Sequence, residues 1–200
     1  MASSGPSRGQ KIMSSESIGT GDVIAAFGLE GVVLFPYAET ESSPLSVRAS
    51  SFLSRVAVPN DYFFISRGGP EEDGEAAEES VCVGSWAADE DLGFDVPEAC
   101  RSWLIVGHFP CAAAALNPAD DHVCSFSYDG DGKPILIHRD LESLVRSLIT
   151  LKHFCEEREE NEDLSPEELR TRVDSFDRLP FSEEASEWNR MYEEIVDGIF

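Results

Sequence analysis

The stretch from Ser102 to Glu157 constrains the fold more than any other part of this chain. It contains short apolar runs separated by turn residues, followed by one long segment whose apolar residues recur at helical spacing. Short apolar runs bounded by turns are typical of strands, and an amphipathic helix beside them can bury its apolar stripe on the sheet. The sequence therefore predicts a sheet covered by a helix, with most of the core formed here.

Four strands are predicted within this stretch, at residues 103–106, 112–116, 123–127 and 135–137. Asp129-Gly130-Asp131-Gly132 is a strong hairpin signal because Asp and Gly tolerate positive φ. The connections are short, so neighbouring strands should pair antiparallel. Asp140 then caps a helix with one buried stripe. The stripe consists of Leu141, Leu144, Val145, Leu148, Leu151 and Cys155.

The flanking regions add shorter elements on both sides of this framework. Those predicted before it are a helix at 23–27 capped by Asp22, a strand at 32–35, a helix that starts at Ser43-Pro44, a strand that starts at Tyr62, and strand character at 81–83 and Trp86. After it, Ser165-Pro166-Glu167-Glu168 is a capping box that starts one helix, and Ser182 opens a last one.

These elements predict an α+β fold, with a mostly antiparallel central sheet covered by helices and a C-terminal helical pair. Residues 1–17 are rich in Ser and Gly and are predicted to form a flexible tail, within which Met13 is an alternative start. Residues 18–200 should form a single domain, on which residues 165–200 pack as a helical extension.

Negative charge is concentrated in two segments. The chain carries a net charge of −24. Residues 71–98 contain 11 acidic residues and no Lys or Arg, and residues 156–200 contain 16 acidic and 5 basic residues. The remainder is nearly neutral. Such a field repels nucleic acid and anionic lipid and attracts a cationic partner, although solubility alone is an alternative explanation.

The five cysteines are odd in number and scattered, which is typical of a reduced cytoplasmic protein. The N-terminus lacks the apolar region of a secretory signal, and no apolar run is long enough to span a membrane. We therefore expect a soluble cytoplasmic protein that binds neither nucleic acid nor membrane.

The sequence signals for a catalytic or metal site are weak. Residues 129–140 resemble a calcium loop but place Lys133 at its fifth position and Pro134 at its sixth, so a hairpin explains them better. The nearest approach to a zinc site consists of His108, Cys111, His122 and Cys124. These residues lack the short spacing of zinc ligands, and the chain has no nucleophile elbow or glycine-rich phosphate loop. We expect no metal or cofactor; a small cysteine-dependent hydrolase is the weakest alternative.

Four pieces of the chain carry motifs in the order and spacing of a known family. Phe35-Pro36 with residues 48–59 matches an opening strand and an Arg-x-x-x-Phe-Leu helix. Residues 104–107 match an apolar strand that ends in Gly, residues 140–145 a helix start, and residues 186–195 a closing Ser-x-Trp helix with Glu-Glu-Ile. Over about residues 20 to 200, the chain resembles the SUKH superfamily of bacterial toxin-immunity proteins, and within it the fourth subgroup.

The resemblance departs from the family pattern at two places. Ala57-Val58 replaces Gly-Leu before Pro59, and His138-Arg139 replaces Asn-Ser before the long helix. The resemblance implies a protein without catalytic activity that binds a co-encoded toxin and blocks it. Many such toxins act on nucleic acid and carry basic surfaces. The hypothesis is therefore an immunity protein that occludes a basic nuclease or nucleic-acid deaminase; a scaffold module of the same fold is the alternative.

The predicted partner-binding residues lie in and beside the first acidic segment. They are Glu71, Glu72, Asp73, Glu75, Glu78, Glu79, Trp86, Asp89, Glu90 and Asp91. Tryptophan flanked by acidic loops can anchor an interface, although it is more often part of a core. Whether the chain forms oligomers stays open at this point.

Overall fold

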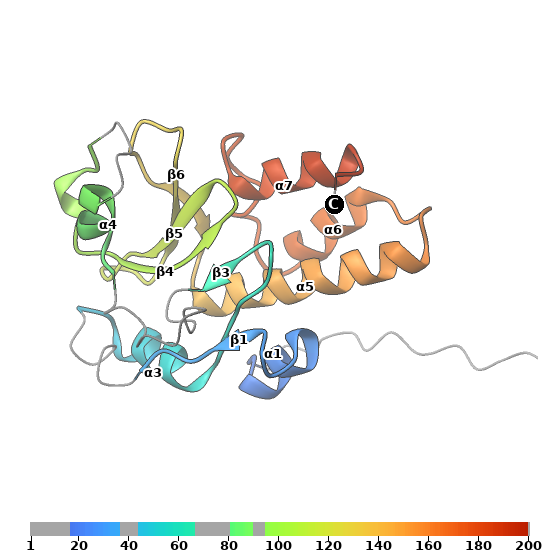
Figure 1. Cartoon of the computed structure of the whole chain (residues 1–200), viewed down its shortest axis with the longest axis horizontal. Coiled ribbons are helices and arrows are strands. Elements are labelled where there is room, and N and C mark those ends of the chain that lie inside the picture. Colours follow the sequence, from blue (N-terminus) through green and yellow to red (C-terminus); the bar gives the residue numbers. More distant parts are fainter. Residues whose placement is uncertain (1–16, 37–43, 67–80, 90–94, 200) are drawn as a thin grey trace, which may run out of the picture.

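A computed structural model describes residues 17–36, 44–66, 81–89 and 95–199. Within these residues six α-helices, one 3₁₀ helix and seven strands are arranged as in Figure 1. Their order is α1 (Thr20–Phe27), β1 (Val32–Val33), α3 (Val47–Arg55), β2 (Val58–Pro59), β3 (Ile65–Ser66), α4 (Val83–Asp89), η1 (Glu98–Cys100), β4 (Leu104–Phe109), β5 (Ala112–Leu116), β6 (Val123–Ser127), β7 (Ile135–His138), α5 (Leu141–Glu160), α6 (Pro166–Asp174) and α7 (Glu187–Val196).

The main sheet has five strands in the order β3-β4-β5-β6-β7, and every neighbouring pair is antiparallel. Register shifts occur in β4 between Ile105 and Gly107, and in β6 between Val123 and Cys124. A second sheet consists of β1 and β2. The α+β class and the antiparallel sheet are therefore confirmed.

Alternation along the strands builds two separate apolar layers. Ala114 and Leu116 of β5 face the core under α5, whereas Ala113 and Ala115 belong to the opposite layer. This is the two-residue period expected for a sheet that is buried on both faces. The small alanines of β5 leave room for larger side chains, such as Trp103 and Phe126 in the layer opposite α5, whose rings lie 6.0 Å apart.

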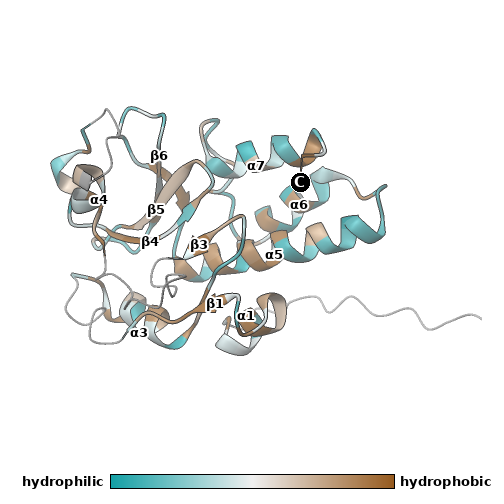
Figure 2. Ribbon diagram, in the orientation of Figure 1, coloured by the Kyte–Doolittle hydropathy of each residue, from teal (hydrophilic) through white to brown (hydrophobic). Residues whose placement is uncertain are grey.

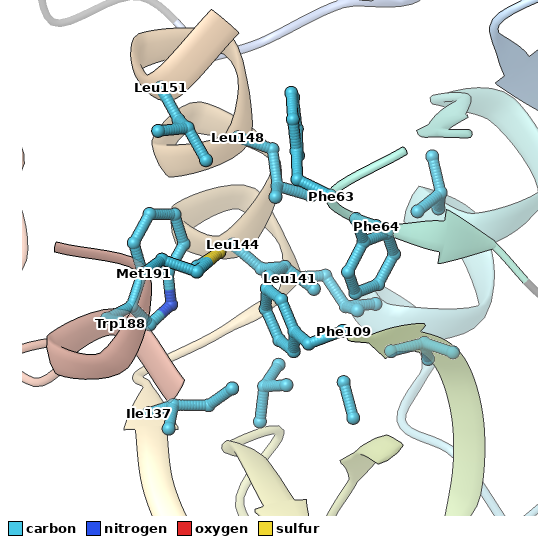
Figure 3. Packing of buried hydrophobic residues seen from close by; sticks show 14 of the residues in the cluster. Phe63, Phe64, Phe109, Ile137, Leu141, Leu144, Leu148, Leu151, Trp188 and Met191 are labelled. Atoms are coloured by element: carbon cyan, nitrogen blue, oxygen red, sulfur yellow. The ribbon is translucent and has the colours of Figure 1, made fainter. Parts of the chain in front are cut away.

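The α5 face carries the main core. Asp140 accepts a hydrogen bond from Ser143 N at 2.8 Å and so caps α5, as predicted. Leu144, Leu148 and Leu151 are fully buried and pack with Phe63, Phe109 and Trp188, among others (Figure 3). Helix α6 packs against α5, and α7 packs against α6 (Figure 1). The described C-terminal helices therefore contribute buried residues such as Leu169, Trp188 and Met191 to this core.

The opposite face is covered by α4 and η1, with buried Val83, Trp86, Val96 and Cys100. A third, smaller cluster joins α1 to the outer side of α5 through Ile18, Val23 and Ile149. No helix in the described ranges is long and apolar enough to cross a membrane.

Several local predictions were wrong. The predicted strand at 81–83 with Trp86 is only an isolated bridge between Cys82 and Leu104, after which helix α4 begins at Val83. The helix predicted from Ser43 begins instead after Ser46, whose hydroxyl accepts from Ala49 N at 3.0 Å. The last helix begins at Glu187, capped by Ser186, rather than at Ser182. In each case a nearby alternative satisfies the same backbone groups, and tertiary packing selects it.

Candidate functional site

Most of the predicted partner-binding residues lie outside the described residues. These are Glu71, Glu72, Asp73, Glu75, Glu78, Glu79, Glu90 and Asp91. Asp89 is the last residue of α4, and its side chain is likewise outside the description. The predicted tail also falls almost entirely on residues that are not described, 1–16.

Ser66 and Val81 are the described residues nearest to Glu71–Glu79, the first part of the acidic segment, and both contact the sheet. Ser66 pairs with Gly107 of β4, and Ser66 Oγ lies 3.5 Å from Val106 O. Val81 O accepts a hydrogen bond from Ile105 N at 3.0 Å. Both ends of the segment therefore lie on the same outer edge of β4, about two residues apart along that strand.

Trp86 does not lie on an exposed surface. Its side chain is 2% exposed, and its ring lies 6.4 Å from that of His108 and 5.9 Å from that of Tyr128. His108 Nδ1 and Tyr128 Oη are 2.7 Å apart, which locks this aromatic group together. A contact between Trp86 and a partner stays a prediction, and it would require the ring to be uncovered first.

The C-terminal region presents a second acidic surface that is described. The end of α5 and the turn after it carry exposed carboxylates, as does the end of α7. This C-terminal acidic surface consists of Glu156, Glu157, Glu159, Glu160, Glu162, Asp163, Glu193 and Asp197. Arg158 Nη1 donates to Ile195 O at 2.6 Å, which holds the two helix ends side by side.

Several arginines of this region are committed to internal partners. Arg172 makes two hydrogen bonds to Glu157, at 3.0 and 2.8 Å, and a third to Glu168 at 3.1 Å. The hydrogen bonds from Arg172 lower the pKa of Glu157. Arg190 pairs with Glu194 at 3.5 Å, and Arg170 lies over the Phe181 ring at 5.2 Å. Arg172 therefore offsets Glu157 of the acidic surface, whereas the contacts of Arg170 and Arg190 are with residues outside it.

An apolar patch borders the C-terminal acidic surface. Val196 is 53% exposed and Ile199 is 72% exposed at the end of α7. Figure 2 shows this end as a hydrophobic stretch beside hydrophilic turns of α5 and α7. An exposed apolar pair with a charged rim is a common composition for a protein interface.

A buried polar network is the other chemically distinctive feature. His138 of β7, Ser143 of α5 and Asp177 between α6 and α7 meet in the core and are at most 5% exposed. His138 Nδ1 lies 3.1 Å from Ser143 Oγ and 3.4 Å from Asp177 Oδ2. Ser143 binds Asp177 rather than the free nitrogen of His138, so the arrangement is unsuited to activating a serine nucleophile.

Sequence reasoning missed this network because His138 and Asp177 are far apart in the chain. A signal was nevertheless present: Ser143 lies on the apolar side of α5 and is buried. Buried hydroxyls in such a stripe require polar partners.

The cysteine and histidine candidates are not brought together. His122 Nδ1 lies 3.1 Å from Asp120, and Cys111 N donates to Glu187. Cys124 is buried in the layer under α4, where burial raises its pKa to about 12, which disfavours the reactive thiolate. Within the described ranges, no group of three or more potential ligands is arranged to hold a metal ion.

A small, shallow hollow lies between α3 and the start of α5. It is lined by Arg48, Ala49, Phe52, Asp121, Asp140, Leu141 and Glu142. Arg48 pairs with Asp140 at 2.7 Å and lies 4.0 Å from Glu142.

Comparison with known proteins identifies one family. The model of the SUKH-4 immunity protein family matches residues 18–194. No curated protein and no solved structure matches the chain.

Proposed function

The chain belongs to the SUKH-4 immunity protein family, and from this premise we propose that it binds a toxin domain with a basic surface and blocks it by occlusion. The match to this family over nearly the whole described chain is the observation that carries the proposal. The proposed toxin is a nuclease or nucleic-acid deaminase, because such enzymes need positive charge to bind phosphates. The proposed place of action is the cytoplasm.

Two acidic regions are the proposed contact surfaces. The first is the segment with Glu71, Glu72, Asp73, Glu75, Glu78 and Glu79, together with Trp86, Asp89, Glu90 and Asp91. The second is the C-terminal acidic surface with its apolar patch. Carboxylates accelerate the encounter with a cationic partner, whereas Val196 and Ile199 would supply apolar contact area once the two proteins meet.

The charge part of this proposal is tested with two variants of equal charge change. One replaces Glu71, Glu72, Glu75, Glu78 and Glu79 by Gln; the other replaces Glu156, Glu159, Glu160 and Glu162 by Gln and Asp163 by Asn. Binding to the toxin domain encoded beside the gene is measured at low salt and in about 0.5 M NaCl.

The variant that removes the true contact surface should bind about tenfold or more weakly at low salt, and the difference should shrink at high salt. The other variant serves as its matched control, because it has the same net charge. An equal loss of affinity in both variants would indicate that the toxin responds to the overall negative charge of the protein and not to one surface. If neither variant loses affinity, recognition does not depend on these carboxylates.

The immunity function itself is tested by co-expression. Cells that express the neighbouring toxin domain should survive only when this protein is present. Survival without it, or a toxin that remains fully active when mixed with it, contradicts the proposal.

A further inference from the structure

The buried polar network joins three segments that are distant in the sequence. His138 is the last residue of β7 and is 0% exposed. Ser143 lies in the first turn of α5, and Asp177 lies in the connection between α6 and α7. Trp188 of α7 completes the group, since its ring and that of His138 form a T-shaped pair with centroids 5.4 Å apart.

The hydrogen bonds define the charge of Asp177. Its Oδ2 accepts from Ser143 Oγ and from Arg139 N at 3.3 Å, and its Oδ1 accepts from Leu179 N at 3.1 Å. Burial alone would raise the pKa of Asp177, but the hydrogen bonds from His138, Ser143 and Leu179 outweigh it and hold the pKa at about 2. Asp177 is therefore an ionised carboxylate with its oxygens satisfied.

The same bonds define the state of His138. The Ser143 hydroxyl donates a hydrogen bond to Asp177, so the N–H on His138 Nδ1 is shared between Ser143 Oγ, 3.1 Å away, and Asp177 Oδ2, 3.4 Å away. The neutral imidazole then carries its proton on Nδ1, and Nε2 is a bare acceptor. Neither His138 Nε2 nor Trp188 Nε1 has a hydrogen-bond partner in the described part of the chain.

A second proton on His138 would have to enter at Nε2. That would place a charged N–H donor inside the core, beside the Trp188 ring and without an acceptor. Burying such a group is unfavourable. Burial accordingly lowers the pKa of His138.

Nearby carboxylates raise the pKa of His138 and so oppose the effect of burial, but none of them accepts a hydrogen bond from Nε2. Asp177 and Asp140 both favour the protonated imidazole, but Asp177 lies on the Nδ1 side. Asp140 is occupied by Arg48 at 2.7 Å and by Ser143 N. On α7, the carboxylate of Glu187 accepts from Cys111 N at 3.3 Å, and the contact of that helix with His138 is through Trp188.

We propose that the His138–Ser143–Asp177 network is an acid-released latch. While His138 is neutral, the network fixes the connection between α6 and α7 against β7 and α5; a proton at Nε2 displaces Trp188 and loosens α7. The latch is independent of the identity of any partner. It also links the position of Val196 and Ile199, at the end of α7, to the protonation of one buried side chain.

The pH window follows from the direction of the shift. The unfolded chain binds the proton at the ordinary histidine pKa of 6.5, whereas the folded chain resists it. Stability is therefore lost as pH falls below 6.5 and continues to fall until the lowered pKa of the folded state is reached. Asp177 acts separately at lower pH, as its carboxylate is protonated between 3.8 and about 2.

The test is urea unfolding of the full chain between about pH 7.5 and about pH 5, for the natural protein and two variants. His138→Gln removes the titrating group, and His153→Gln replaces an exposed histidine as the matched control. The unfolding equilibrium constant of the natural protein should rise by up to about tenfold per pH unit below 6.5. His153→Gln should keep this dependence and His138→Gln should lose it. An unchanged dependence in His138→Gln overturns the proposal.

A measurement on the natural protein covers the case in which His138→Gln does not fold. Amide hydrogen exchange is compared at about pH 7.5 and about pH 5.5 after correction for the intrinsic rate. Amides of α7 around Met191 should lose protection at the lower pH, whereas those of α5 around Leu148 should keep it. Equal protection in α7 at both pH values, or equal losses in both helices, contradicts a latch.

Discussion

The two faces of the main sheet differ in how they are covered. The α5 face is covered by one helix of 20 residues with a side-chain cap, and α6 and α7 pack beside it. The α4 face is covered by a helix of 7 residues and a single 3₁₀ turn. Besides its buried apolar side chains, this covering segment is held by backbone hydrogen bonds from Val83 N to Trp103 O and from Gly84 N to Arg101 O, both at 2.9 Å.

The two faces also differ in what they carry. The α5 face forms the large core that stabilises the fold, and it carries the C-terminal acidic surface and the buried network on the same helical layer. The α4 face carries a smaller apolar cluster under short covering elements.

The largest expected effect compares leucines on the two faces. Leu148→Ala on α5 removes a fully buried side chain and should lower the free energy of unfolding by about 3–4 kcal/mol. Leu136→Ala on β7 removes a partly buried side chain from the α4 face and should cost about 1–2 kcal/mol. Urea unfolding measures both. If Leu136→Ala costs as much as Leu148→Ala, the two faces contribute equally and the comparison fails.

A smaller effect concerns glycines at close approaches on each face. A Cβ at Gly107 would lie 2.4 Å from Phe64 Cζ and 2.8 Å from Ile65 O, so Gly107→Ala must displace β3. We expect a loss of about 2 kcal/mol. At Gly84 of α4 the nearest atoms, of Arg101, would lie 3.0 Å away, so Gly84→Ala should cost less. Thermal unfolding distinguishes them; a larger loss at Gly84 would show that α4 is the more rigidly held layer.

The smallest effect concerns a buried carboxyl on α7. Burial raises the pKa of Glu187, so the folded state holds its proton above the ordinary value of 4.5 and loses stability as pH rises through the raised pKa. Glu187→Gln can still accept from Cys111 N, and it should raise stability at neutral pH by about 0.5–1 kcal/mol. Exposed Glu193→Gln is the control. A destabilised Glu187→Gln would mean that the ionised carboxylate is needed.

Local patterns predicted the long elements best. The strands predicted at 112–116 and 123–127 coincide with β5 and β6, and Asp140 caps α5 as expected. Alternation and capping are properties of neighbouring residues, so these elements can be read without knowledge of the fold. The candidate site could be predicted only in part. The sequence shows the excess of carboxylates after Glu156, but it does not show which arginines pair with neighbouring carboxylates.

Short elements could not be predicted in the same way. Val58–Pro59 follows α3 and ends its helical pattern, yet it also pairs with β1 as a strand of the second sheet. Val83–Asp89 is helical although its start resembled a strand. Segments of two to seven residues have too few local hydrogen bonds to determine their own state, so their contacts with Arg101 and Trp103, or with β1, decide it.

The sequence by itself determined the α+β class, the antiparallel framework, the separation of charge from that framework and the family to which the chain belongs. Only the tertiary structure decided that Trp86 is buried, that the ends of the central acidic segment lie on one edge of β4, and that His138, Ser143 and Asp177 meet. The physical reason is the range of the interactions: periodicity and capping act between neighbours, whereas burial and polar networks depend on residues that only folding brings together.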